Sequence, residues 1–379
     1  MSQHQIPDTA FKSLFEINMG IRQGERVLLF SDTIRDDEKP SPSDLDRRCR
    51  LNAAARMAAK YAFEVYGSGE FVEFPATSAS GVEPPETLWL AAFGLNIISE
   101  LKSNGLLGKL LSKTASSGDV DSAHKIVTAK KDEVADIIVA LSNNSTSHTR
   151  FRLLACAAGC RFASLPHFDP DMFATSMTVD WNNLAEITER LVAAVNQAEW
   201  IHVKSPNGTD MMICKKGRMA KGDDGLLVAS GSFGNLPAGE AYFAPLEGLS
   251  YGKMVIEWGP TRKLDEPLII TVENGTAVRI QGSDPLRERL EERFSENPEC
   301  RNLAELGIGT NDKASRPDNV LEAEKILGTI HLALGDNTGF GGTVSAPFHE
   351  DYVFCRPTLT AIDKDGAETV VICDGKLLV

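Results

Sequence analysis

The sequence lacks the segments that direct proteins into or across membranes. No apolar run is long enough to span a bilayer, and the N-terminus has no basic start followed by an apolar stretch. The seven cysteines are odd in number and form no Cys-x-x-Cys pair, which predicts free core thiols in a reducing compartment. We therefore expect a cytoplasmic protein without a membrane partner.

Positive charge is also scarce. The chain has 39 Lys and Arg against 53 Asp and Glu, a formal net charge of −14. Its best basic runs are Lys130-Lys131 and residues 214–218, and both are short. Because a phosphate backbone is bound by clustered Lys and Arg, nucleic acid is not an expected partner.

Several common catalytic motifs are missing. The chain contains no G-x-S-x-G, no H-E-x-x-H and no G-x-G-x-x-G after a first strand, which argues against a serine hydrolase, a zincin and a dinucleotide enzyme. The glycine-rich segment 335–342 lacks the Lys-Ser/Thr of a phosphate loop. We interpret it as a turn-rich connection that lets His331 and His349 approach each other.

The order of expected elements predicts two domains, as a length of 379 residues suggests. Before residue 180, short apolar strands alternate with helices, a pattern typical of an α/β domain with a mainly parallel sheet. The expected strands are 26–31, 70–75, 134–142 and 161–165, and the expected helices are 9–19, 44–66 (capped by Ser43-Asp44), 86–113 with breaks at glycines, and 150–159.

After a helix at 184–198 the pattern changes to short strands and hairpins. Asn-Gly pairs at 207–208 and 274–275 lie between strand-like runs, a strong hairpin signal, and one amphipathic helix is expected at 285–297. We therefore predict an N-terminal α/β domain at 1–180 and a C-terminal β-rich mixed domain at 181–379, which carries a metal site and makes the chain α/β plus α+β.

Two histidines of the C-terminal half are candidates for metal ligands. His331 lies in the apolar run ILGTIHLALG, where a buried ring needs a bonding partner. His349 and Asp351 face the same side of an extended strand, and an imidazole beside a carboxylate is typical of a divalent-cation site. Taken alone, this pair is even more typical of a structural salt bridge.

His148 is a weaker candidate. It follows the expected strand 134–142, and ligands of α/β sheets bind at that edge. A helix-start role for Ser147 and Thr149, with His148 as a bystander, is an equally good interpretation.

Two acidic residues complete the set. Glu240 opens an apolar and aromatic run, and Glu305 is isolated among small and apolar residues. Carboxylates are rarely buried without a partner, so a shared metal site explains both residues better than separate roles. The predicted metal-ligand residues are Glu240, Glu305, His331, His349 and Asp351.

Over nearly its whole length the chain resembles the aminopeptidase T / aminopeptidase S / PepS family of thermophilic metallopeptidases. The segments INMGIRQGERVLLF, TSHTRFRLLACAAGCRFASLP, LPAGEAYFAPLEG, AELGIGTN, GTIHLALGDN and HEDYVF resemble its motifs in order. The resemblance implies a leucyl aminopeptidase-like hydrolase, a metalloprotease that removes N-terminal residues from small peptides. It also implies a homodimer and two divalent metal ions (Zn, Co or Mn), with Glu305 as the bridging and catalytic ligand.

Two positions depart from the family pattern. A further ligand glutamate should shortly precede His331, but the nearest candidate, Glu324, lies seven residues upstream. The family tyrosine that follows this histidine is missing, and Tyr242 or Tyr352 could substitute for it.

The segment GDNTGFGGTVSAPFHED is also similar to 2,5-dihydroxypyridine dioxygenase, a non-haem iron enzyme of the same fold with two histidines and one carboxylate. In that enzyme the position of Glu305 is a histidine, and those of Glu240 and His331 are apolar. Since this chain keeps all three residues, we expect the two-metal hydrolase. The alternative is a ring-cleaving dioxygenase with a single Fe(II).

Overall fold

A computed structural model describes residues 6–379 and divides the chain into two compact units. The first unit runs to Thr178 and also includes Gly225–Pro237. The second comprises Val179–Asp224 and Ala238–Val379. The first unit therefore takes up a later segment that returns from the second half of the chain.

The first unit contains a five-stranded parallel sheet, which confirms the predicted sheet type. Its strand order is β2-β1-β3-β4-β8, and every neighbouring pair is parallel. The bounds are β1 Val27–Thr33, β2 Glu70–Pro75, β3 Ile137–Ala140, β4 Arg161–Ser164 and β8 Phe233–Asn235. Strand β8 comes from the returning segment, and it forms one edge of this sheet.

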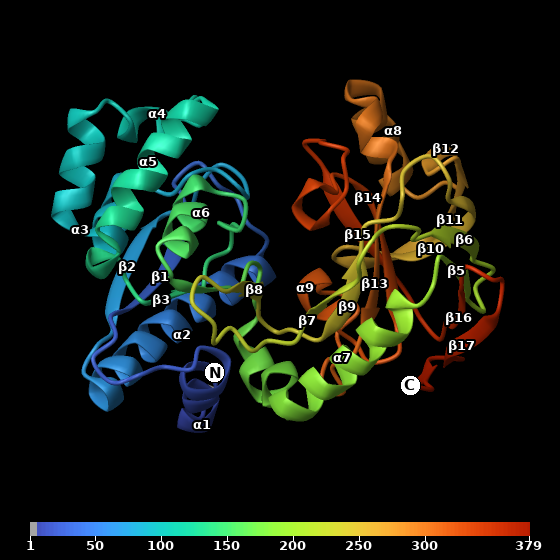
Figure 1. The fold of residues 1–379 in the computed structure, drawn as a ribbon, viewed down its shortest axis with the longest axis horizontal. Coiled ribbons are helices and arrows are strands. Elements are labelled where there is room, and N and C mark those ends of the chain that lie inside the picture. The colour runs from blue at the N-terminus through green and yellow to red at the C-terminus, as the bar shows by residue number, and fades with distance from the viewer. Residues whose placement is uncertain (1–5) are drawn as a thin grey trace. The chain divides into compact units, whose positions relative to one another are not determined.

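Helices cover both faces of the parallel sheet (Figure 1). Helix α2 (Pro42–Tyr66) packs against β1 on one face, while α3, α5 and α6 share a core on the other face with Phe30. The α-helices are α1 Asp8–Lys12, α3 Glu86–Ser103, α4 Leu107–Leu111, α5 Ser117–Ala129 and α6 Arg150–Ala157, and shorter helical turns are η1 Ser13–Asn18, η2 Lys131–Glu133, η3 Pro170–Ala174 and η4 Ser176–Thr178.

Helix α2 begins earlier than predicted. The Ser41 side chain accepts a hydrogen bond from the Asp44 amide at 3.2 Å, and Pro42 suits the first helical position. The cap is therefore Ser41 rather than the predicted Ser43-Asp44 pair.

The second unit contains two antiparallel sheets. The larger has eight strands in the order β12-β11-β10-β6-β5-β16-β17-β18, and the smaller has five in the order β15-β14-β13-β9-β7. The strands are β5 Trp200–Lys204, β6 Asp210–Cys214, β7 Lys221–Asp223, β9 Glu240–Phe243, β10 Tyr251–Gly259, β11 Arg262–Glu273, β12 Thr276–Gln281, β13 Leu303–Gly309, β14 Ile330–Gly335, β15 His349–Phe354, β16 Thr358–Ile362, β17 Glu368–Cys373 and β18 Lys376–Leu377. Both hairpins predicted from Asn-Gly pairs are confirmed, as β5–β6 and β11–β12.

A continuous hydrophobic core lies between the elements of this unit. The five-stranded sheet contributes alternate residues to it, among them Phe243, Leu306 and Leu332. Helices α7 (Trp181–Asn196) and α8 (Leu286–Glu296) add apolar residues to the same core, and η5 Pro298–Arg301, α9 Val320–Ala323 and η6 Thr338–Phe340 are short turns. Because successive strand residues point to opposite faces, the residues between these core positions face away from the core.

All seven cysteines are free thiols, as predicted, but they do not all lie in the core. Cys160, Cys214 and Cys300 are buried, whereas Cys49, Cys355 and Cys373 are exposed. Cys49 lies in α2, and Cys373 ends β17, next to the edge strand of the eight-stranded sheet. Within residues 6–379, no helix is both long and apolar enough to cross a membrane.

Candidate metal centre

The five predicted ligand residues lie on one face of the five-stranded sheet. Glu305 and Asp351 are both opposite Ala333, while His331 is opposite Gly307 and Glu240 is opposite Gly309. Directly opposed residues of antiparallel strands point to the same face. The strand register therefore brings together Glu240, Glu305, His331, His349 and Asp351, although they come from four different strands.

Glycines on this face make room for the site. A Cβ added at Gly307 would lie 2.1 Å from the His331 ring, and one at Gly309 would lie 2.1 Å from the carbonyl oxygen of Ile326. Both distances are far below contact distance, so only glycine permits the imidazole and the passing backbone to lie directly on β13.

Glu305, His349 and Asp351 form the more exposed of two ligand clusters, which we call the outer triad. His349 Nε2 lies 3.4 Å from Glu305 Oε2 and 3.5 Å from Asp351 Oδ2, and 29% of the His349 side chain is exposed. Asp351 Oδ1 is buried and has no hydrogen-bond partner within residues 6–379. A buried carboxylate oxygen without a donor fits a metal ion, because its desolvation otherwise goes uncompensated.

The orientation of His349 is fixed by a second hydrogen bond. Its Nδ1 donates to the carbonyl oxygen of Asp336 at 2.7 Å, which leaves Nε2 to face the two carboxylates. Histidines that bind metals usually donate their other ring N–H to a carbonyl or carboxylate in this way. The outer triad therefore has both the ligand set and the support that a metal ion requires.

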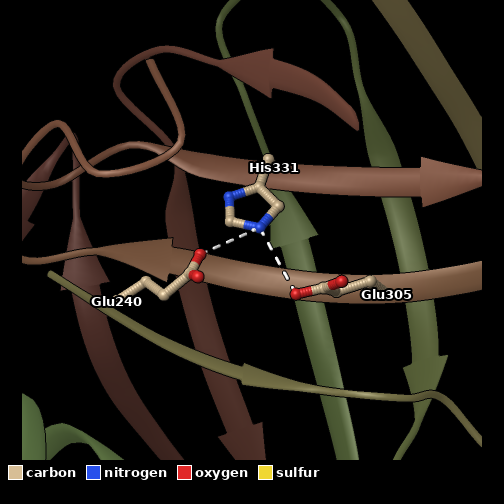
Figure 2. Close-up of side chains that lie close together, drawn as sticks. All are labelled: Glu240, Glu305 and His331. Atoms are coloured by element: carbon tan, nitrogen blue, oxygen red, sulfur yellow. Dashed lines mark ion pairs between the residues drawn. The ribbon is translucent and has the colours of Figure 1, made fainter. Parts of the chain in front are cut away.

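Glu240, Glu305 and His331 form the second cluster, which we call the inner cluster. Figure 2 shows the His331 imidazole pointing at both carboxylates, with Nε2 3.2 Å from Glu240 Oε2 and 3.6 Å from Glu305 Oε1. All three residues are buried, and His331 Nδ1 has no hydrogen-bond partner in the described part of the chain. The inner imidazole thus lacks the second support that His349 has.

A lysine that sequence reasoning missed lies beside the inner cluster. Lys325 Nζ is 2.5 Å from Glu240 Oε1 and 3.3 Å from Glu324 Oε2, and the side chain is 1% exposed. Burial alone would lower the pKa of this amine, but the carboxylates of Glu240 and Glu324 raise it well above its ordinary value. The available signal was the charged pair Glu324-Lys325 directly before the largely apolar run ILGTI.

Without a metal, the histidines share protons with the carboxylates. Burial alone would lower the pKa of His331, but the hydrogen bond to Glu305 and the charges of Glu240 and Asp351 raise it to about 9. Burial alone would raise the pKa of Glu305, yet hydrogen bonds from His331 and His349 lower it. A metal ion that binds the outer triad must therefore displace a proton from His349, whose pKa is also raised, because only neutral imidazole is a ligand.

Two aromatic rings lie at the open side of the site. Phe340 packs edge-on against the His349 ring at a centroid distance of 5.5 Å and against Tyr242 at 6.0 Å. Tyr242 therefore lies near the predicted ligand residues, as a substitute for the missing family tyrosine would have to. Tyr352 does not, because it is buried on the opposite face of β15 and donates a hydrogen bond to Glu350.

The loop that carries Phe340 is held by two acidic side chains. Glu247 accepts hydrogen bonds from the Thr343 amide at 2.8 Å and from the Asn337 side chain at 3.0 Å, and it pairs with Arg218. Asp336 accepts a bond from the Ala346 amide at 3.1 Å. These bonds fix the carbonyl group that orients His349.

His148 is not part of either ligand cluster. It belongs to the first unit, in the segment between β3 and α6. Thr149 caps α6 by accepting a hydrogen bond from the Arg152 amide at 3.2 Å, and the Ser147 hydroxyl donates to that of Ser164. The helix-start interpretation is therefore confirmed for Thr149.

This protein belongs to the class of metal-dependent enzymes. The clustered ligand residues, the family match and the shared fold all support this class. The NicX family, described as 2,5-dihydroxypyridine 5,6-dioxygenase, matches residues 99–378, and the chain belongs to this family. No match is found among curated proteins.

Two solved structures share the fold. The 2,5-dihydroxypyridine dioxygenase from Pseudomonas putida KT2440 aligns with 100% of this chain and 98% of its own, at 18% identity and a TM-score of 0.69. Wild-type AmpT from Thermus thermophilus aligns with 98% of each chain, at 14% identity and a TM-score of 0.63. The predicted fold class is confirmed, and the resemblance to aminopeptidase T holds for the fold.

The prediction of an aminopeptidase, a protease and a hydrolase is wrong, because the family match is to a ring-cleaving dioxygenase. The prediction rested on the presence of Glu240, Glu305 and His331. That prediction treated Glu240 as free to bind a metal ion. In the fold, the ammonium group of Lys325 is bonded to Glu240. The expected homodimer and the absence of nucleic-acid partners stay predictions.

Proposed function

We propose that this protein is an Fe(II)-dependent dioxygenase that cleaves a dihydroxylated pyridine-type ring, and that Glu305, His349 and Asp351 hold the iron. The outer triad carries the proposal: its ligand atoms lie within 4.8 Å of one another, inside the segment that matches the family. Non-haem Fe(II) oxygenases typically use three histidine and carboxylate ligands and keep other positions open. Bound Fe(II) would supply the redox chemistry with molecular oxygen.

The ligand set departs from the usual two histidines and one carboxylate, because Glu305 provides a second carboxylate. Two carboxylates balance the charge of a dication, so the loaded outer triad is electrically neutral. The chemistry of this oxygen-rich set suits Fe(II) or Mn(II) and disfavours softer metal ions.

The aromatic side chains support a flat substrate. Phe340 already packs edge-on against His349 and Tyr242, so a planar ring can pack against the same wall within reach of the outer triad. The ring would also displace water from the exposed side of His349, which strengthens the interactions of the charged groups there.

His331 can handle the proton that a ring hydroxyl loses when it binds. Its Nε2 lies between Glu305 Oε1 and Glu240 Oε2, at 3.6 and 3.2 Å. Because both carboxylates face this one nitrogen, a proton carried on Nε2 can go to either of them, and the neutral ring can take one up again from Glu305.

The test is a ring-cleavage assay in air-saturated buffer. The protein is first loaded with Fe(II) under anaerobic conditions. We expect 2,5-dihydroxypyridine to lose its ring absorbance with stoichiometric oxygen uptake. Glu305→Gln and His349→Ala should reduce the rate by at least about 100-fold, as removal of a metal ligand does. His202→Ala is the matched control, because that histidine pairs with Asp210 on the other sheet. Iron-loaded, folded protein that consumes neither ring nor oxygen contradicts the proposal.

A further inference from the structure

Lys325 is a buried lysine directly beside side chains that resemble metal ligands. Its ammonium group contacts Glu240 at 2.5 Å and Glu324 at 3.3 Å, and its side chain is 1% exposed. A buried ammonium group needs carboxylates or carbonyl oxygens around it to offset its desolvation, and Lys325 has two carboxylates. Glu240 is therefore already paired with a cation that belongs to the chain.

The backbone holds Lys325 in this place. Its carbonyl oxygen accepts a hydrogen bond from the Asn311 amide at 2.8 Å, and Leu327 N donates to the carbonyl of Asn311 at 3.0 Å. The same segment lies directly on Gly309, where an added Cβ would be 2.1 Å from the Ile326 carbonyl oxygen. The position of the ammonium group is therefore set by the fold and not by a flexible surface side chain.

We infer that Lys325 is a built-in cation that takes the place of a second metal ion in the inner cluster, so that the centre holds a single metal. The inference deepens the proposed function, because it rests on the assignment of that metal to the outer triad. His331 then acts as a positioning residue for Glu305, and Glu240 positions His331 and Lys325; neither Glu240 nor His331 binds the metal.

Charge balance supports one metal. In the outer triad, Glu305 and Asp351 balance a dication. Beside the inner cluster, the Lys325 ammonium group contacts Glu240 at 2.5 Å and Glu324 at 3.3 Å. A dication bound to Glu240 would share that carboxylate with the ammonium group, and like charges repel strongly in a buried site.

The two imidazoles differ in a way that agrees with this assignment. His349 has its Nδ1 bonded to the Asp336 carbonyl oxygen, whereas His331 Nδ1 has no hydrogen-bond partner within residues 6–379. Metal-bound histidines are usually held from the second nitrogen. Only the outer imidazole meets that condition.

The test counts metal ions in Lys325→Met, which keeps a long, unbranched side chain but removes its charge. Wild type and variant are loaded with Mn(II), desalted and measured by elemental analysis. We expect one ion per chain in the wild type and two in Lys325→Met, with the spectroscopic signature of a spin-coupled Mn(II) pair only in the variant. Lys325→Arg, which keeps the charge, should stay at one.

Two further variants identify the cause. Lys215→Met removes another buried ammonium group, which is bonded to the carbonyl oxygens of Arg218 at 2.8 Å and Ala198 at 3.4 Å, and it should leave the count at one. In the double variant Lys325→Met with Glu240→Gln, the count should return from two to one, because the second ion loses its carboxylate.

Each outcome decides the inference. Two ions in the wild type, or one ion in a folded Lys325→Met, overturns it. If Lys325→Met does not fold, Lys325→Gln replaces it with the same expected count of two. Because the count needs no turnover, a one-metal protein that fails to cleave the ring contradicts the proposed function and leaves the role of Lys325 standing. A two-metal wild type that cleaves the ring contradicts only the role of Lys325.

Discussion

His331 and His349 face different oxygens of the same carboxylate, but their surroundings differ. Each Nε2 lies within 3.6 Å of Glu305. The outer imidazole is partly exposed and bonded to a backbone carbonyl, whereas the inner one is 2% exposed and its Nδ1 is unbonded within the described residues. Clusters of identical ligand types are therefore not equivalent: the groups that surround each imidazole decide which one can bind a metal.

The largest expected effect separates the two histidines directly. His349→Ala should weaken Mn(II) binding by more than about 100-fold and abolish ring cleavage, because it removes a ligand together with its fixed orientation. His331→Ala should weaken binding by only about 10-fold, since it removes a side chain that orients Glu305 and not a ligand. Isothermal titration of the metal-free variants measures both values. Equal losses for the two variants would show that the inner imidazole is also a ligand.

A smaller effect is expected at the aromatic wall on the outer side. Phe340→Ala should raise KM for the dihydroxylated ring by about 10-fold, because the ring loses about 0.5–1.5 kcal/mol of aromatic contact together with apolar burial. Metal content should not change, because Phe340 touches His349 only through its ring. Phe340→Leu is the control, because it keeps an apolar side chain at this position but removes the aromatic ring. A change in metal content, or an unchanged KM in Phe340→Ala, would argue against a substrate role.

Most of the fold could be predicted from local sequence patterns. Strand and helix periodicity located α6 and α7 to within a few residues, and the Asn-Gly pairs located both hairpins. Alternation also placed His349 and Asp351 on one face of β15, where the structure has them. Strand β8 was not predicted, because it joins the parallel sheet from a segment about 70 residues after β4. Local sequence patterns do not indicate pairing between strands that are so far apart in the chain.

The site was predictable to a lesser degree. All five predicted residues come together because the strand register places them on one face of the five-stranded sheet. Lys325 was missed because it lies outside a strand, and its closeness to Glu240 depends on the bridge between Asn311 and Ile326. The hydrogen bond from His349 to the carbonyl oxygen of Asp336 could not be predicted either, because every residue has a backbone carbonyl group. These missing contacts are the ones that distinguish the two clusters.

The smallest effect concerns the loop that orients His349. Burial alone would raise the pKa of Glu247, but hydrogen bonds from the Thr343 amide and Asn337, with the charge of Arg218, lower it from 4.5 to about 2. A lowered folded-state pKa means stability that is present above pH 4.5 and is lost as pH falls toward 2. Urea unfolding of the metal-free protein at pH 5 and pH 3 should show this loss, about 1 kcal/mol after allowance for partial exposure. Glu247→Gln should be less stable at pH 5 and lose less on acidification. An acid loss as large as that of wild type would mean that other carboxylates hold the loop, and that the support of His349 does not depend on Glu247.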